Sequence, residues 1–128
     1  MKKFVFMVEK TGTGFSAYAK DEKVNVGTTG KNIPEIKSNI IESFNLLNEH
    51  QNKKAVKAEE IVIQLDLPQF FNYYKIINAK ALSERIGMNQ SLLSQYITGD
   101  KTPSEKQVER IIKGVKDAAR EILELELA

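Results

Sequence analysis

The pattern of hydrophobic and polar positions changes once along the chain, near residue 66. Before this point, short runs of β-forming residues alternate apolar and polar side chains, as in FSAYAK (Phe15–Lys20), which is typical of strands. After it, apolar residues recur at three- and four-residue spacings, which is typical of amphipathic helices. The change predicts two domains, residues 1–66 and residues 67–128.

The first domain is predicted to contain strands and a helix. Asn32 and Glu35 have the spacing of a capping box, and the apolar residues that follow share one helical face as far as Glu49. The stretch GTTGKN (Gly27–Asn32) is expected to interrupt the strands. The predicted order is β-β-β-α-β, with strands at Phe4–Glu9, Phe15–Lys20, Val24–Val26 and Glu59–Leu67.

The second domain is predicted to be all helical. Asn78 and Asn89 are placed to cap helices, and Gly87 and Gly99 are placed to end them. The predicted helices are Pro68–Ile77, Ala79–Ile86, Gln90–Ile97, a fourth from Pro103 and Ser104 to about Gly114, and a fifth from Val115. The fold class is therefore α+β: an N-terminal β-β-β-α-β antiparallel sheet with one helix, followed by an all-α helix-turn-helix domain.

The two short helices around Gly87 are the part of the pattern that points to function. In GMNQSLLSQYITGDKTPS (residues 87–104), Leu93, Tyr96 and Ile97 fall on one side of a helix and are expected to face a core. Uncharged hydrogen-bonding side chains fall on the opposite side, and such side chains can both donate and accept at base edges in the major groove. The alternative is that this side is an ordinary solvated helix face.

The candidate DNA contacts form two groups. Gln can bond bidentately to adenine and Ser can bond to several base edges, so base reading is expected from Gln90, Ser91, Ser94 and Gln95. Phosphate contacts position a protein without choosing sequence, and they are expected from the flanking Lys80, Asn89, Lys101 and Thr102. Because one such helix makes few phosphate contacts, we expect a homodimer or higher oligomer that reads a palindromic operator.

These residues carry a resemblance to a known family. The stretch LSERIGMNQSLLSQYITGDKTPS (residues 82–104) resembles the helix-turn-helix of the lambda-repressor-like (Cro, XRE) class, and the resemblance covers about Pro68–Gly114. It implies that the second of the two helices lies in the major groove of double-stranded DNA. Such repressors often have Gln just inside the preceding helix, where this chain has Ala79.

The N-terminal half resembles the HicB-type antitoxin domain, which has a partial RNase-H-like fold. The stretches FVFMVEKTGTGFSAYAKD (residues 4–21) and GTTGKNIPEIKSNIIESFNLL (residues 27–47) carry this resemblance. It implies the antitoxin of a type II toxin-antitoxin pair, which neutralises a small HicA-like mRNA-cleaving toxin and represses its own operon. The alternative is a stand-alone transcriptional regulator whose N-terminal domain senses a ligand or dimerises.

Composition narrows these expectations. The chain has 128 residues, no cysteine and a net charge of +2, so neither a disulfide framework nor a Cys-based metal site is expected. No run approaches the length of a membrane span, which predicts a cytoplasmic protein without membrane contact. Carboxylates such as Glu9 and Asp66, and the single His50, lack the partner pattern of a catalytic site. We therefore expect neither enzymatic activity nor a cofactor.

The C-terminal stretch carries two patterns at once. A helical stripe is formed by Val115, Ala118, Ala119, Ile122 and Leu125, whereas ILELELA (residues 122–128) alternates like a strand. Either form can bury apolar surface against a second copy. We therefore expect a C-terminal dimerisation segment, with helix and strand both open as its secondary structure.

Overall fold

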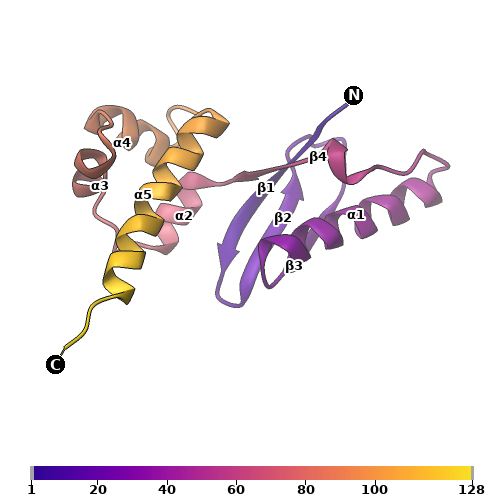
Figure 1. The fold of residues 1–128 in the computed structure, drawn as a ribbon. Helices are drawn as coiled ribbons and strands as arrows, with labels where there is room; N and C mark the ends of the chain where they lie inside the picture. The colour runs from indigo at the N-terminus through magenta and orange to yellow at the C-terminus, as the bar shows by residue number, and fades with distance from the viewer. Residues whose placement is uncertain (1, 128) are drawn as a thin grey trace. The chain divides into compact units, whose positions relative to one another are not determined.

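The computed structural model describes residues 2–127 and divides the chain after Asp66 into two compact units (Figure 1). We call residues 1–66 unit 1 and residues 67–128 unit 2. The described residues form a four-stranded sheet and five α-helices, which agrees with the predicted α+β class. The outermost positions of the two predicted domains, Met1 and Ala128, lie outside the described residues.

Unit 1 combines the sheet with one α-helix. In chain order, its elements are β1 (Phe4–Thr11), β2 (Gly14–Ala19), β3 (Gly27–Gly30), α1 (Ile33–His50), a 3-10 turn (Ala58–Glu60) and β4 (Ile61–Leu65). The strands lie in the order β3-β2-β1-β4, and β1 pairs antiparallel with β2 but parallel with β4. The predicted antiparallel sheet is therefore wrong in this respect. Since α1 returns the chain to the end of the sheet where β3 began, β4 enters in the same direction as β1.

The third strand lies later in the sequence than predicted. Val24–Val26 is not part of the sheet, whereas GTTG, which was expected to interrupt it, forms β3 and pairs with β2. Close approach of α1 explains the choice of residues, because a Cβ added to Gly30 would lie 3.0 Å from the backbone nitrogen of Ile36. Strand propensity favours the valines. It gives the wrong strand here because it takes no account of how closely α1 approaches the sheet.

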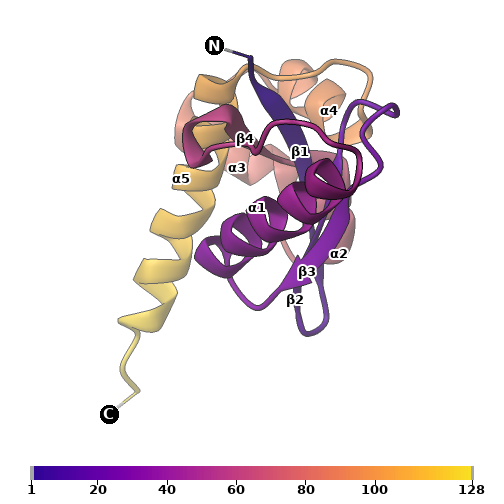
Figure 2. The same ribbon diagram turned by 90° about the vertical axis from the view of Figure 1, so that its right-hand side faces the viewer.

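Helix α1 covers one face of the sheet (Figure 2). It begins as predicted, because the Asn32 side chain accepts a hydrogen bond from the Glu35 N–H at 2.9 Å. The rings of Phe4 and Phe44 meet edge to face with their centres 4.8 Å apart. The predicted apolar stripe of the helix forms the core of unit 1, in which the buried residues include Phe6, Val8, Ala17, Ile36, Ile40 and Phe44.

Unit 2 is helical, with α2 (Leu67–Tyr73), α3 (Ala79–Ile86), α4 (Gln90–Thr98) and α5 (Glu105–Leu123). The bounds of α3 and the start of α4 are as predicted. The predicted strand Glu59–Leu67 and helix Pro68–Ile77 are both too long. Leu67 begins α2 instead of ending β4, and α2 gives way after Tyr73 to a turn in which the Ile77 N–H donates to the Tyr74 carbonyl at 3.1 Å.

Helix α5 is one continuous helix where two were predicted. Gly114 does not end a helix: it is buried in the middle of α5, where an added Cβ would lie 2.3 Å from Ile86 Cγ2 and 3.1 Å from Leu82 Cδ1. The glycine therefore lets α3 pack closely on α5. A glycine inside a helical pattern signals either an end or a close contact, and here the contact explains it.

The C-terminal stretch continues α5 and then leaves it. The helix ends at Leu123, and residues 124–127 have no regular secondary structure. The predicted helix is thus confirmed as far as Ile122, but Leu125, the last residue of the predicted stripe, lies beyond it. The strand pattern of ILELELA forms no strand in its described residues. Ala128 lies outside them.

Candidate nucleic-acid interface

Local hydrogen bonds fix the ends of α3 and α4. Asn78 caps α3 by accepting from the Ala81 N–H at 3.0 Å. Gly87 ends α3 with φ 66°, in the left-handed region that favours glycine. Asn89 then caps α4, because its side-chain oxygen accepts from the N–H groups of Ser91 at 2.9 Å and Leu92 at 3.2 Å. The two caps and the glycine confirm the signals read from the sequence and set the path between the helices.

Arg110 of α5 braces the same turn from outside it. Its guanidinium donates to the carbonyl oxygens of Ile86 at 2.7 Å and Gly87 at 2.9 Å. A cation at these carbonyls also suits the negative end of the α3 dipole. Sequence reasoning missed this residue, because the partners are far apart in the chain and no local pattern links them.

Helix α4 has a buried side and an exposed side. Leu93 and Tyr96 are buried and Ile97 is half-buried, as the wheel pattern predicts. Gln90, Ser91 and Ser94 are exposed together on the first two turns. Gln95 differs: it is half-buried, and its backbone carbonyl accepts from the Lys101 N–H at 3.1 Å. The structure thus gathers three of the four predicted base-reading residues on one exposed surface.

The predicted phosphate contacts lie at three places in unit 2. Lys101 and Thr102 are exposed in the turn after Gly99, which has φ 87°. Lys80 is exposed on the first turn of α3. Asn89 is exposed at the start of α4, where its side-chain oxygen is used by the cap, so only its amide nitrogen is available to donate to a phosphate.

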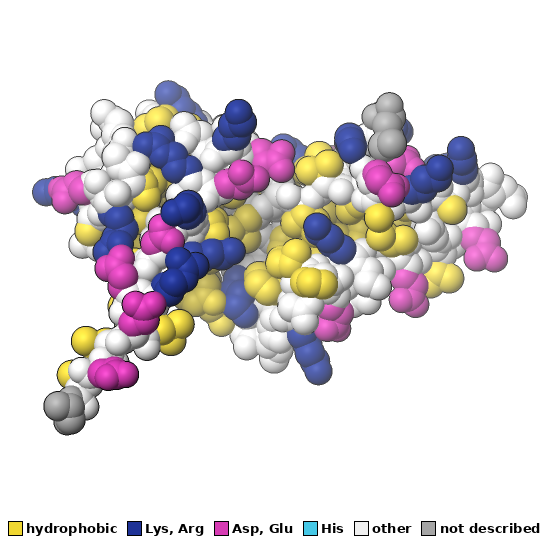
Figure 3. Space-filling model, in the orientation of Figure 1, with side chains coloured by type: hydrophobic (Ala, Val, Ile, Leu, Met, Phe, Trp, Pro, Cys, Tyr) yellow, Lys and Arg dark blue, Asp and Glu magenta, His cyan; other side chains and the backbone are white. Residues whose placement is uncertain are grey.

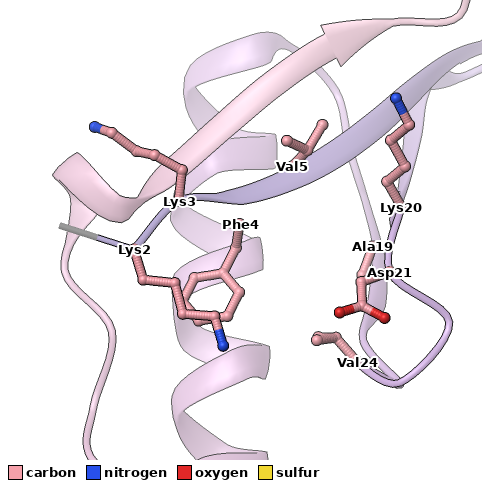
Figure 4. Close-up of a pocket in the computed structure, with 8 residues that line it drawn as sticks. All are labelled: Lys2, Lys3, Phe4, Val5, Ala19, Lys20, Asp21 and Val24. Atoms are coloured by element: carbon pink, nitrogen blue, oxygen red, sulfur yellow. The ribbon is translucent and has the colours of Figure 1, made fainter.

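Unit 1 has a shallow pocket of about 270 Å³ at the start of β1 (Figure 4). The Lys2 ammonium lies 5.0 Å from the centre of the Phe4 ring. The Lys3 ammonium points away from the pocket and donates to the Glu59 carbonyl at 2.6 Å. The pocket therefore has an apolar floor and charged groups at its rim that do not converge on one point. Its lining residues are Lys2, Lys3, Phe4, Val5, Ala19, Lys20, Asp21 and Val24.

The carboxylates of unit 1 influence one tyrosine. Burial raises the pKa of the Tyr18 phenol, and the negative charges of Asp66 and Glu9 raise it further. Among the described residues, no group of three or more His, Cys, Asp or Glu side chains is placed to hold a metal ion. His50 is exposed at the end of α1.

Comparison with known proteins adds no family to this geometry: no family model, curated protein or solved structure matches the chain. Among residues 2–127, no helix has the length and apolar character required to cross a membrane. A role for the surface of α3 and α4 is therefore inferred from the chemistry of its exposed side chains. It presents amide and hydroxyl groups on one helix, with lysines on both sides of it in the sequence.

Proposed function

We propose that the chain is the antitoxin of a type II toxin-antitoxin pair and the repressor of its own operon. Unit 2 binds a palindromic operator in double-stranded DNA through a lambda-repressor-like helix-turn-helix formed by α3 and α4. Unit 1, a HicB-like partial RNase-H-like domain, binds and blocks a small HicA-like mRNA-cleaving toxin. The protein acts in the cytoplasm as a homodimer or higher oligomer, without catalytic activity or a cofactor.

The observation that carries the DNA-binding role is the exposed side of α4. Gln90, Ser91 and Ser94 stand clear of the packed side of the helix, and Gln and Ser are side chains that read base edges in the major groove. Asn89 and Arg110 hold the start of the helix and the turn before it, so the backbone that carries the reading side chains is held in place. A backbone that is already ordered supports recognition, because less conformational entropy is lost on binding.

A contrast between two variants tests the roles of these side chains. Gln90→Ala should weaken binding to the preferred operator by about 1–3 kcal/mol and relax sequence choice at the base pair that it reads. Lys101→Ala should weaken preferred and random duplexes alike and reduce the salt dependence by about one contact. Both effects are measured by fluorescence anisotropy with DNA from upstream of the chain's own gene and with a random duplex of the same length.

Gln51→Ala and Lys54→Ala serve as matched controls, because both positions are exposed in unit 1. They should leave DNA binding unchanged. If Gln90→Ala and Lys101→Ala alter both duplexes in the same way, α4 does not read bases.

The antitoxin role is supported by the order of elements in unit 1, β-β-β-α-β, and by the helical unit in the same chain that we propose to bind DNA. It requires a partner encoded beside it. Co-expression with the product of the adjacent short reading frame should yield a stable complex and suppress cleavage of mRNA by that product. A neighbouring product that neither co-purifies with the chain nor is neutralised by it would contradict this role and leave the DNA-binding role standing.

The alternative is a stand-alone helix-turn-helix regulator whose unit 1 senses a ligand, and the lysine-rimmed pocket at the start of β1 favours it. Such a regulator would change its affinity for DNA when a small anionic metabolite is added. Lys20→Ala, at the rim of the pocket, should then remove the response. An affinity that no metabolite alters would rule out this alternative.

A further inference from the structure

Unit 2 leaves a large part of its apolar surface uncovered at its C-terminal end, which we call the tail (residues 122–127). The end of α5 projects beyond α2, α3 and α4 (Figure 1). The exposed fractions are 70%, 85%, 69% and 88% for Ile122, Leu123, Leu125 and Leu127. Glu124 and Glu126 separate the leucines, and Figure 3 shows acidic and hydrophobic side chains following one another along this end. The tail is therefore apolar and acidic together.

A second uncovered apolar surface lies in the connection between α2 and α3. Ile76 is 91% exposed and Tyr73 is 44% exposed, and the exposed Lys75 stands between them in the sequence. We call residues 73–76 the α2–α3 patch. Its side chains are apolar and basic, which is the charge complement of the tail.

The tail and the α2–α3 patch belong to the same end of unit 2. Helix α3 packs on α5 at Gly114, where an added Cβ would meet Ile86 and Leu82. The last turn of α3 contacts both halves of α5, because the carbonyl of Ile86 accepts from Arg110 and Arg85 donates to Glu121. Figure 1 shows the connection between α2 and α3 on the same side of unit 2 as the C-terminal half of α5. Within one chain, neither surface covers the other, since both are exposed.

We propose that two copies of the chain pair through this end, with the tail of each copy covering the α2–α3 patch of the other. A two-fold axis makes both contacts at once, and the assembly closes as a dimer. The tail leucines cover Ile76 and Tyr73, while Glu124 and Glu126 lie near Lys75. Pairing of one tail with another would instead bring glutamates together, and like charges placed opposite each other are destabilising.

The spacing of this dimer suits the DNA-binding role, and in this respect the pairing rests on the proposed function. With a rise of 1.5 Å per residue, Arg110 and Ile122 are about 18 Å apart along α5. Two copies joined at this end hold their α3–α4 turns up to about 36 Å apart along that direction. Operator half-sites one DNA turn apart require a similar distance.

Sedimentation velocity of the full chain over a range of concentrations tests the pairing. The wild-type chain should sediment as a dimer. Ile76→Glu and Leu125→Lys should each raise the dimer dissociation constant by about thirtyfold or more, the effect of losing an interface hot spot. Leu46→Glu is the matched control, because Leu46 is 62% exposed in unit 1, and it should remain a dimer. A monomeric wild type, or variants that stay dimeric, overturns the proposal.

Mixing the two variants tests whether the tail of each copy contacts the α2–α3 patch of the other. When Ile76→Glu and Leu125→Lys chains are mixed in equal amounts, one intact contact re-forms and the introduced lysine meets the introduced glutamate. The dimer should therefore return. Each variant should be monomeric alone and have the circular dichroism of the wild type. If such variants fail to pair in the mixture, the tail of one copy does not contact the α2–α3 patch of the other.

DNA binding separates the failure of this proposal from the failure of the proposed function. Monomeric variants should keep the sequence preference that depends on Gln90 at a single half-site, and should lose affinity for the whole palindrome. If the wild-type chain does not form a dimer but keeps its preference for the operator sequence, only the dimer proposal is rejected. A wild-type chain that pairs as described but shows no sequence preference rejects only the reading role of α4.

Discussion

The two units of the chain keep their shapes by different means. In unit 1, the buried residues come from segments that are far apart in the sequence, and α1 packs Ile36, Ile40 and Phe44 against the strands. In unit 2, each helix contributes only one or two large buried side chains, namely Leu67, Phe71, Leu82, Leu93, Tyr96 and Ile111. Three of its four helices start at a cap from a neighbour in the sequence, namely Asn78, Asn89 and Ser104, whereas unit 1 has one such cap, Asn32 at the start of its single α-helix.

This difference separates two sources of stability. Unit 1 relies on contacts that exist only after its strands and α1 have come together, so damage to one buried side chain should affect the whole unit. Unit 2 relies more on local signals, so loss of a cap should affect one helix end. The comparison can be tested by changing one residue of each kind and following hydrogen exchange through both units.

The largest expected effect is that of Phe6→Ala in the core of unit 1. Phe6 is completely buried, and truncation of a buried Phe costs about 3–5 kcal/mol of unfolding free energy. Denaturant titration measures the loss, and hydrogen exchange should show reduced protection across β1, β2 and α1 with α3 and α4 unchanged. Leu46→Ala, at an exposed position of α1, should cost only about 0.5 kcal/mol. Equal loss of protection in both units would break the comparison.

A smaller effect is expected from Gly14→Ala at the start of β2. Gly14 has φ 157°, and an added Cβ would lie 2.3 Å from the Gly30 carbonyl oxygen and 2.9 Å from the Lys31 Cα. Because both obstacles are backbone atoms, they cannot move aside as a side chain can, and overpacking should cost about 1–3 kcal/mol. Gly12→Ala in the same hairpin turn meets nothing within 4 Å and should be nearly neutral. Similar unfolding midpoints for the two variants would contradict this contact.

The same difference explains which features the sequence could predict. The bounds of α3 and the caps of α3 and α4 follow from short-range signals such as Asn78 and Gly87, and the structure confirms them. The place of β3 and the parallel direction of β4 depend on where α1 crosses the sheet, so no local pattern contains them. The role of Gly114 could not be predicted from a local pattern either, because it depends on contact with Ile86 and Leu82 of α3.

The candidate site also combines features that local sequence patterns predict with features that depend on contacts elsewhere in the fold. The exposure of Gln90, Ser91 and Ser94 follows from helical periodicity alone. The half-burial of Gln95 does not, because the turn through Lys101 folds back onto the carbonyl of Gln95. The brace from Arg110 is likewise a long-range contact.

The third effect is that of Asn89→Ala at the start of α4. Removal of the capping oxygen leaves the N–H groups of Ser91 and Leu92 without their partner, which should cost about 1 kcal/mol. Hydrogen exchange should increase in the first turn of α4 and nowhere in unit 1. Asn72→Ala, at an exposed position of α2, is the control and should change neither quantity. Loss of protection throughout unit 2 would show that its helices depend on one another more than the comparison states.

The smallest effect is a pH dependence in unit 2 that has no counterpart in the core of unit 1. Arg85 of α3 donates to both carboxylate oxygens of Glu121 in α5, at 2.6 and 3.2 Å. The hydrogen bond from Arg85, and then its charge, lower the pKa of Glu121 below the ordinary 4.5. A lowered folded-state pKa means that the stabilisation is present above pH 4.5 and is lost as the pH falls through the folded-state value. Both side chains are well exposed, so the contribution is small.

Thermal unfolding of Glu121→Gln beside the wild type tests this pair. The variant should unfold at a slightly lower temperature at pH 7, and the gap should close as the pH falls below 4.5, because the wild-type carboxylate is then protonated and loses its advantage over the amide. Glu84→Gln is the matched control, since Glu84 is exposed on α3, and its difference from the wild type should not follow the same course. A gap for Glu121→Gln that stays constant from pH 7 to the acid limit would contradict a stabilising role of this ion pair. Helices α3 and α5 would then be joined by the packing at Gly114 and the hydrogen bonds from Arg110.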